Sequence, residues 1–275
     1  MTYAGIAGQL LERRFRHGPI ALARLGPRDV TRFVTETARS SPGRMKVILS
    51  ALRVFLRWLH QRGATPTSLA GCVPSAPDWR LVTVPKALPT EQVEQIVASC
   101  DRATARGRRD YAILLLLARL GLRAGEVVAM ELDDLDWQQG ELLVRGKGGW
   151  QDGLPLPHDV GAAIADYLRW GRPACASRRV FVSVRAPVSA FAGPSAISDL
   201  VRRALDRAGL DPPRKGAHTL RHALACTMLH RGASLTEIGQ ILRHRSPETT
   251  AIYAKVDVAG LRALALAWPQ PAGAR

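Results

Sequence analysis

The sequence is poor in cysteine, in long apolar segments and in acidic residues. Its four cysteines lie far apart and form no Cys-x-x-Cys pair, so neither a zinc site nor a disulfide framework is indicated. The longest strongly apolar run, residues 111–118, ends at Arg119. The first residues of the chain lack the pattern of a signal peptide, which is a basic segment followed by a long apolar one. We therefore expect a reduced, cytoplasmic protein without a signal peptide and without a membrane partner.

Acidic residues are outnumbered by basic ones, with 23 Asp and Glu against 39 Lys and Arg, and the formal net charge is +16. The basic residues are interspersed with Leu, Ala and Val, which favours a folded protein with a basic face over a disordered tail. Such a face indicates a partner that carries phosphate. Ribosomal proteins, basic membrane-binding proteins and DNA enzymes share this balance, so charge alone does not name the partner.

A chain of 275 residues, 47% of them hydrophobic, has room for two domains with substantial cores. The stretch between Ala64 and Pro89 is rich in proline and lacks a steady apolar period, which is typical of an interdomain linker. We place a helical N-terminal domain at residues 1–80, the linker at 81–88 and a second domain at 89–275.

Helical patterns dominate both predicted domains. Residues 43–63 predict an amphipathic helix with a basic side formed by Lys46, Ser50, Arg53, Arg57 and His60. That side is either a solvated helix face or a surface laid against a DNA groove. Thr90 is the expected N-cap of a further helix, a second helical run reaches Gly121, and residues 162–170 and 195–208 predict two more helices.

Residues 136–156 interrupt the helices with strand-like segments that are separated by turn-like Gln139-Gly140 and Gly146–Gly149. They predict a small antiparallel sheet of about three strands. The expected fold class is therefore mainly α with a small antiparallel β-sheet.

The sequence HTLRH places His218, Arg221 and His222 on one face of a predicted helix, roughly 5–6 Å apart at Cβ. A zinc site is a weak interpretation, because a zincin motif requires Glu where Thr219 stands. Histidines with a purely structural role are the ordinary alternative.

Ser234 begins a capping box for a helix predicted to run through Arg243, and Ser246-Pro247 supplies the start of the next helix. Tyr253 then lies about two turns into that second helix. Taken alone, this pair of helices is similar to a helix-turn-helix, and Tyr253 would be a half-buried packing residue.

The combination of these features is more specific. His218-x-x-Arg221, His244 and, nine residues later, Tyr253 together resemble the second conserved box of the tyrosine recombinases, or phage integrases. Upstream, residues 121–126 (GLRAGE) resemble that family's first arginine box, and residues 146–148 (GKG) resemble its hairpin lysine.

The resemblance is strong from Pro89 onward, whereas the preceding residues match by helix pattern and position alone. Trp150 departs from the basic residue often found after the Gly-Lys-Gly turn, which puts the hairpin's DNA contacts in doubt but not the lysine. Since Arg123 comes early in the chain, we expect the opening helix of the N-terminal domain to be abbreviated or missing.

The resemblance implies six catalytic residues: Arg123, Lys147, His218, Arg221, His244 and Tyr253. The two arginines would bind the phosphate, because a guanidinium pairs with two oxygens and stays protonated. Tyr253 would be the nucleophile, His218 would assist its deprotonation, His244 would donate to the phosphate and Lys147 would be the general acid. Glu126 would be a support that holds local geometry.

The implied activity is site-specific recombination or integration of double-stranded DNA through a 3′-phosphotyrosyl intermediate, with no metal or nucleotide cofactor. The resemblance further implies a core-binding domain and a catalytic domain that clamp the duplex, and a homo-oligomer, a tetramer on paired DNA sites. The expected DNA-binding residues are Lys46, Arg53, Arg57, Arg202 and Arg203. Residues 256–268 predict a tail helix that packs on its own domain or on a neighbouring protomer.

Two other functions remain open at this point. A type IB topoisomerase shares the Arg, Lys, His and Tyr chemistry but relaxes supercoils as a monomer. A DNA-binding regulator of the same fold would bind DNA without cutting it. The retention of all six reactive residue types and the HTLRH box favour recombination.

Overall fold

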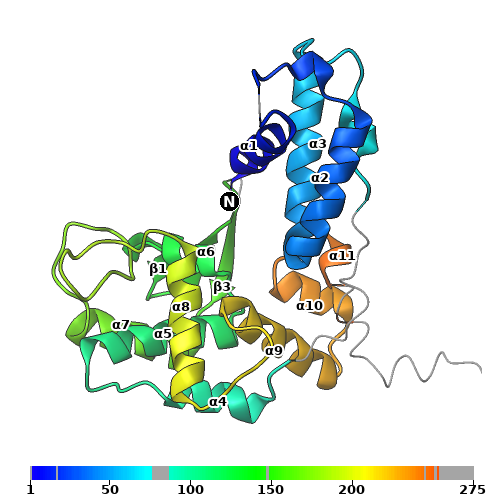
Figure 1. Ribbon diagram of the computed structural model, residues 1–275. Helices are drawn as coiled ribbons and strands as arrows, with labels where there is room; N and C mark the ends of the chain where they lie inside the picture. The colour runs from blue at the N-terminus through cyan, green and yellow to red at the C-terminus, as the bar shows by residue number, and fades with distance from the viewer. Residues whose placement is uncertain are drawn as a thin grey trace, which may run out of the picture. The chain divides into compact units, whose positions relative to one another are not determined.

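The computed structural model describes residues 2–16, 18–75, 87–146, 149–244, 246–250 and 253. It divides the chain into two compact units, Met1–Val82 and Thr83–Arg275 (Figure 1). Helices dominate, and a small antiparallel sheet accompanies them, so the predicted fold class is confirmed. Within the described ranges, no helix has the length and apolar character needed to cross a membrane.

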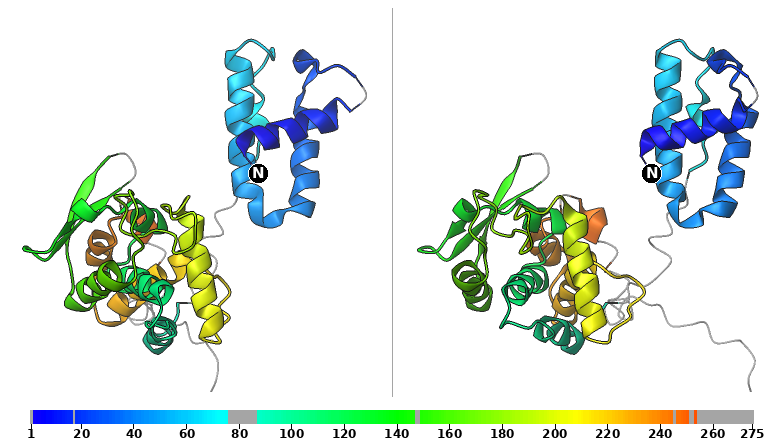
Figure 2. Two further views of the ribbon diagram at one scale, coloured as in Figure 1. Left: turned by 90° about the vertical axis from the view of Figure 1, so that its left-hand side faces the viewer. Right: turned by 60° about the vertical axis from the view of Figure 1, so that its left-hand side comes forward.

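The first unit contains the helices α1 (Tyr3–Arg14), α2 (Pro27–Ser40) and α3 (Met45–Gln61). Figure 2 shows α1 crossing the pair formed by α2 and α3. The three helices enclose a core of aliphatic side chains and Phe33. The core forms because apolar residues recur every third or fourth position along each helix and so lie on one face. The amphipathic helix predicted for residues 43–63 is confirmed as α3.

Part of the proline-rich stretch belongs to this first unit. A 3₁₀ turn at Leu69–Cys72 follows α3, and Leu69 and Val73 are buried in the helical core. Residues 64–75 therefore belong with the helical core of the first unit, because prolines exclude helix but do not exclude packing. Of the linker placed at 81–88, residues 81–86 lie outside the described residues, and Leu88 is buried in the core of the second unit.

The described helices of the second unit are α4 (Thr90–Ala98), α5 (Ala105–Arg119), α6 (Ala124–Ala129), α7 (His158–Trp170), α8 (Pro194–Arg207), α9 (Ala217–His230), α10 (Leu235–Ile241) and α11 (Pro247–Thr250). Thr90 is the first residue of α4 and Pro89 occupies the N-cap position, so the predicted cap is one residue too late. Ser234 caps α10 as predicted, but that helix ends at Ile241 and does not continue through Arg243.

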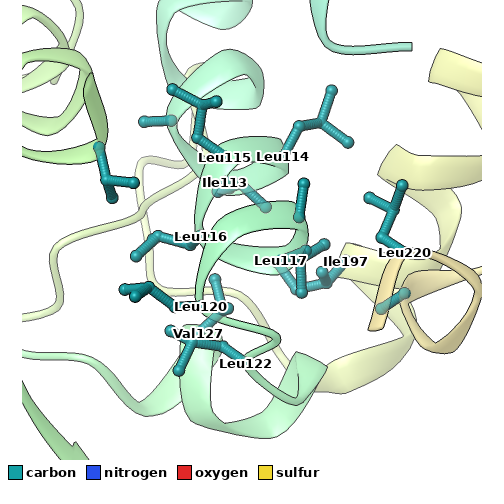
Figure 3. Close-up of a cluster of buried hydrophobic side chains, with 14 of the residues drawn as sticks. Ile113, Leu114, Leu115, Leu116, Leu117, Leu120, Leu122, Val127, Ile197 and Leu220 are labelled. Atoms are coloured by element: carbon teal, nitrogen blue, oxygen red, sulfur yellow. The ribbon is translucent and has the colours of Figure 1, made fainter. Parts of the chain in front are cut away.

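The core of the second unit surrounds α5. All residues from Ala112 to Ala118 are buried, which explains why this half of the helix is apolar on every side. Figure 3 shows Leu117 of α5 beside Ile197 of α8, with Leu220 of α9 on the same side. This core fixes α9 and the turn after α5, which carry the residues of the candidate site.

The predicted three-stranded sheet is confirmed, with antiparallel strands β1 (Leu135–Asp136), β2 (Glu141–Arg145) and β3 (Gln151–Pro155) in that order. Leu142 pairs with both Leu135 and Leu154, so one apolar row spans the sheet. The connection between β2 and β3 contains Lys147, which lies outside the described residues. The amide of Gly146 donates to the carbonyl of Trp150 at 2.9 Å and closes this connection.

Candidate active site

The N-terminal turns of α9 carry His218, Arg221 and His222. Their spacing places all three side chains on one face of the helix, as predicted. The rings of His218 and His222 meet edge to face, with 6.1 Å between centroids. The predicted helical face is therefore present in α9, and the other residues of the candidate site lie next to it.

Arg221 is buried, with 9% of its surface exposed. Its Nη1 donates to the carbonyl of Gly121 and its Nη2 donates to the carbonyl of Leu242. Burial, together with the nearby charge of Arg123, lowers the pKa of Arg221 to about 10, so the side chain remains a cation at neutral pH. The site thus holds a buried positive charge tied to two backbone segments.

Gly121 is required where Arg221 meets the end of α5. Its φ is +57°, a conformation that glycine adopts without steric cost. A Cβ at this position would also lie 2.6 Å from Cδ2 of Leu242 and 3.0 Å from Cδ2 of Leu224. Glycine therefore allows both the turn into Arg123 and the close packing of the segment that follows α10.

Arg123 and Glu126 form a second cationic position at the start of α6. The Glu126 carboxylate accepts from the amide of Arg123 at 2.8 Å and from Arg123 Nη1 at 2.7 Å. Burial alone would raise the pKa of Glu126, but these hydrogen bonds and the charge of Arg243 outweigh it and lower the pKa. Glu126 is therefore an ionised carboxylate that holds Arg123, whose side chain is 42% exposed.

His244 lies just after α10, and its Nδ1 is 2.7 Å from Oγ1 of Thr250 at the end of α11. Burial and then the charges of Arg221 and Arg123 lower the pKa of His244 to about 4, so the ring is neutral at pH 7. When the Thr250 hydroxyl donates to Nδ1, the ring proton is on Nε2. Nε2 is then a hydrogen-bond donor.

Tyr253 is 2% exposed, and its hydroxyl is 2.7 Å from Nδ1 of His222. Burial and then Cys226 raise the pKa of Tyr253, although the charge of Arg221 acts in the opposite direction. Burial and His218 lower the pKa of His222 to about 4, so a neutral His222 can accept the phenolic hydrogen bond. Described α11 ends at Thr250, and residues 251–252, which separate it from Tyr253, lie outside the described residues.

Five of the six predicted catalytic residues belong to this cluster, and the sixth, Lys147, lies outside the described residues. Arg123 and Arg221 both donate to carbonyls of the segment before His244. Tyr253 contacts the residue that follows Arg221. His218 reaches Tyr253 only through the intervening ring of His222.

The predicted DNA-binding residues fall into two classes. Lys46, Arg57 and Arg202 are exposed, and Arg202 pairs with Asp199 at 3.1 Å. Arg53 and Arg203 are half-buried. Nη2 of Arg53 donates to the carbonyls of Val73 and Pro74, so this side chain holds the segment after the 3₁₀ turn.

Three residues of the cluster were not predicted to be functional: His222, Arg243 and Thr250. His222 shares the helical face of His218, but residue spacing does not show which of the two rings meets the tyrosine. Thr250 and His244 are separated by a helix start, so no helical period relates them. Arg243 was expected to lie inside a helix, and no sequence signal marked it.

The comparisons with known proteins all point to one protein family. Residues 86–259 match the model of the phage integrase family. The integrase/recombinase-type protein y4rA of Sinorhizobium fredii is 50% identical over 98% of this chain and 66% of its own length. The related protein y4rF is 38% identical over 84% of this chain and 55% of its own length. This chain thus spans about two thirds and about half of those two relatives.

A tyrosine recombinase XerD of Xanthomonas axonopodis pv. citri is 33% identical over 92% of this chain and 88% of its own length. Among solved structures, XerH bound to a difH substrate has a TM-score of 0.68 at 17% identity, covering 93% of this chain and 76% of that one. A lambda integrase dimer bound to a core site has a TM-score of 0.66 at 16% identity, covering 97% and 90%. At these identities, the structural matches establish the fold.

Proposed function

Because the chain belongs to the phage integrase family, we propose that it is a site-specific recombinase that cuts and rejoins double-stranded DNA through a covalent bond to Tyr253. The observation that carries this proposal is the convergence of Arg123, Arg221, His244 and the His222–Tyr253 pair on one cluster. Each of these residue types meets a requirement of phosphoryl transfer.

The first requirement is fixed positive charge, because the transition state spreads negative charge over the non-bridging oxygens of the phosphate. Arg123 and Arg221 supply guanidinium groups with planar donor pairs. Nε2 of His244 supplies a neutral donor beside them. These groups are held by Glu126, by backbone carbonyls and by Thr250, so little reorganisation is needed when the phosphate binds.

The second requirement is activation of a poor nucleophile. The oxygen of Tyr253 forms a bond to phosphorus while the bond between phosphorus and the 5′ oxygen breaks. The phenolic proton passes to the pair His218–His222, of which His222 is already in hydrogen-bond contact. In the proposal, Lys147 protonates the departing 5′ oxygen. The reverse reaction with a new 5′-hydroxyl rejoins the strand, so no nucleotide cofactor is needed.

Exchange between two sites requires that two duplexes be held together, and we propose a homo-oligomer, a tetramer on paired sites, for that step. The exposed basic residues Lys46 and Arg57 of α3 add DNA affinity in this proposal. The XerH and lambda integrase structures named above contain DNA, as their descriptions state. That likeness supports DNA as the partner of this chain.

Covalent trapping tests the proposal. Nicked duplexes with randomised arms are incubated with the protein, SDS-resistant adducts are sequenced, and the selected duplex becomes the substrate. A nick beside the scissile phosphate lets the short 5′-hydroxyl fragment leave, so the adduct accumulates. We expect an adduct with the wild-type protein and none with Tyr253→Phe, which still binds the duplex. Tyr111→Phe, a half-buried tyrosine of α5, is the matched control and keeps the adduct.

Other outcomes separate the alternatives. An adduct with Tyr253→Phe would contradict the nucleophile assignment. Relaxation of supercoiled plasmid that lacks the selected site would favour a type IB topoisomerase. Sequence-specific binding without any adduct from the wild-type protein would favour a DNA-binding regulator.

A further inference from the structure

Arg243 has an unusual backbone conformation immediately after α10. Its φ is 53°, and it is the only non-glycine residue with a positive φ in the part of the chain that the structure describes. A side chain in this conformation crowds its own backbone, so glycine is the ordinary occupant. Other residues persist there where surrounding contacts compensate, which is common at functional sites.

The side chain of Arg243 supplies such contacts. It is 2% exposed, and its Nη2 lies 3.0 Å from Oε2 of Glu126. Its Nη1 donates to the carbonyl of Ile241 at 3.1 Å. A buried guanidinium is costly unless an anion faces it, so the carboxylate of Glu126 is a required partner. The ion pair joins the end of α10 to the first turn of α6, 117 residues earlier.

The backbone around Arg243 contacts both arginines of the candidate site. Arg123 Nη2 donates to the carbonyl of Arg243 at 3.0 Å, and Arg221 Nη2 donates to the carbonyl of Leu242. Glu126 in turn accepts from Arg123. Arg123, Glu126 and Arg243 therefore form a closed ring of contacts. The carbonyl of Leu242, the residue before Arg243, accepts a hydrogen bond from Arg221.

From this geometry, we propose that Arg243 is a positioning residue for DNA cleavage, which fastens the Leu242–His244 segment to Glu126 and thereby orients Arg123 and Arg221 toward the scissile phosphate. The inference rests on the proposed function, since it assigns a role within the same site. Arg243 does not itself reach DNA, because its side chain is buried. It acts through the two carbonyls and the shared carboxylate.

A purely structural role makes a different prediction. If Arg243 only ended α10, glycine would serve at least as well, because it adopts this φ at no steric cost. If Arg243 positions the arginines, glycine removes the ion pair with Glu126 and cleavage slows although the turn is retained. Arg243→Gly therefore distinguishes the two roles.

The experiment measures the rate of adduct formation on the selected nicked duplex, together with duplex affinity and the melting temperature. Arg243→Met keeps an unbranched buried side chain and removes the ion pair. We expect Arg243→Met and Arg243→Gly to slow cleavage by about tenfold to hundredfold, with duplex affinity within about twofold of wild type. Arg243→Lys keeps the charge and recovers part of the rate. Arg231→Met, an exposed arginine after α9, is the matched control and leaves the rate unchanged.

A double-mutant cycle supplies the decisive readout. In a Glu126→Gln background, Arg243→Met should slow cleavage by less than about twofold, because the link is already broken. Fully additive losses, or wild-type cleavage by Arg243→Met or Arg243→Gly, would overturn the inference. If Arg243→Met does not fold, the Lys and Gly variants decide. Absence of any adduct from the wild-type protein would instead refute the proposed function.

Discussion

An exposed set of arginines in the first unit and a buried set in the second unit are held in different ways. In the first unit, Arg13 pairs with Glu36 at 3.4 Å with side chains 39% and 52% exposed, and Arg57 of α3 is exposed. In the second unit, Arg221 and Arg243 are 9% and 6% exposed and donate to backbone carbonyls or to Glu126. Exposed pairs are screened by water and salt, whereas buried cations require fixed partners.

This difference indicates a division of labour. An exposed cation gains phosphate contacts at little structural cost and contributes salt-dependent affinity. A buried, fixed cation stabilises developing charge in a site from which water is partly excluded, so it affects rate more than affinity. We therefore expect substitutions in the candidate site of the second unit to change cleavage and acid stability, and substitutions of exposed residues on α3 to change binding.

The largest expected effect comes from Arg221→Lys. Lysine keeps one positive charge but cannot donate to the carbonyls of Gly121 and Leu242 and to a phosphate in the same planar arrangement. Cleavage of the selected duplex should fall by about 10²–10³-fold, while duplex affinity changes by a few-fold. Adduct formation in single turnover and a binding titration measure the two quantities.

The matched control is Arg178→Lys, which makes the same chemical change at an exposed residue paired with Asp133. It should leave the cleavage rate within about twofold of wild type, because exposed pairs contribute little. Similar losses in the two variants would remove the distinction between buried and exposed arginines.

Sequence pattern predicted those parts of the molecule that local chemistry determines. Ser234 and Glu237 form the predicted capping box of α10, with the Glu237 amide 3.2 Å from Ser234 Oγ. The period of residues 43–63 predicted α3, and the glycine-containing turns predicted the sheet. In each case the determining residues are neighbours in the chain.

The remaining features depend on contacts between distant segments. Arg53 was predicted to face DNA, yet it also bonds carbonyls 20 and 21 residues later in the chain. Arg243, which has a left-handed backbone conformation, pairs with Glu126, and no periodicity encodes an ion pair between residues 117 positions apart. The hydroxyl of Tyr253 contacts the ring of His222 and not that of His218. This contact depends on how the rings are oriented, and residue spacing does not determine ring orientation.

Acid should destabilise the second unit through two half-buried histidines, His222 and His244. The pKa of His222 and of His244 is about 4 in the fold, below the ordinary histidine value of about 6.5. At a pH between about 4 and about 6.5, the unfolded chain therefore binds protons more readily than the folded protein does. Stability is therefore lost as the pH falls from about 6.5 to about 4, by about 1 kcal/mol per histidine after allowance for partial exposure.

Urea unfolding at pH 7 and at pH 4.5 measures this loss. His222→Gln keeps a side-chain acceptor near Tyr253 but cannot titrate, so its midpoint should shift less with pH than that of the wild-type protein. His60→Gln, an exposed histidine of α3, should retain the wild-type shift. Equal shifts in all three proteins would show that the half-buried histidines do not control acid stability.

The smallest expected effect comes from the surface of the first unit and separates two arginines of one helix. Arg57→Ala removes an exposed cation, so duplex affinity should fall a few-fold and the salt slope should decrease by about one. Arg53→Ala removes hydrogen bonds to the carbonyls of Val73 and Pro74, so it should also lower the melting temperature. Arg32→Ala on α2 carries the same charge change and serves as the control for net charge. Binding titrations at several salt concentrations measure the slope. Equal slopes for Arg57→Ala and Arg32→Ala would mean that α3 contributes only general charge, and the basic stripe would then be a solvated helix face.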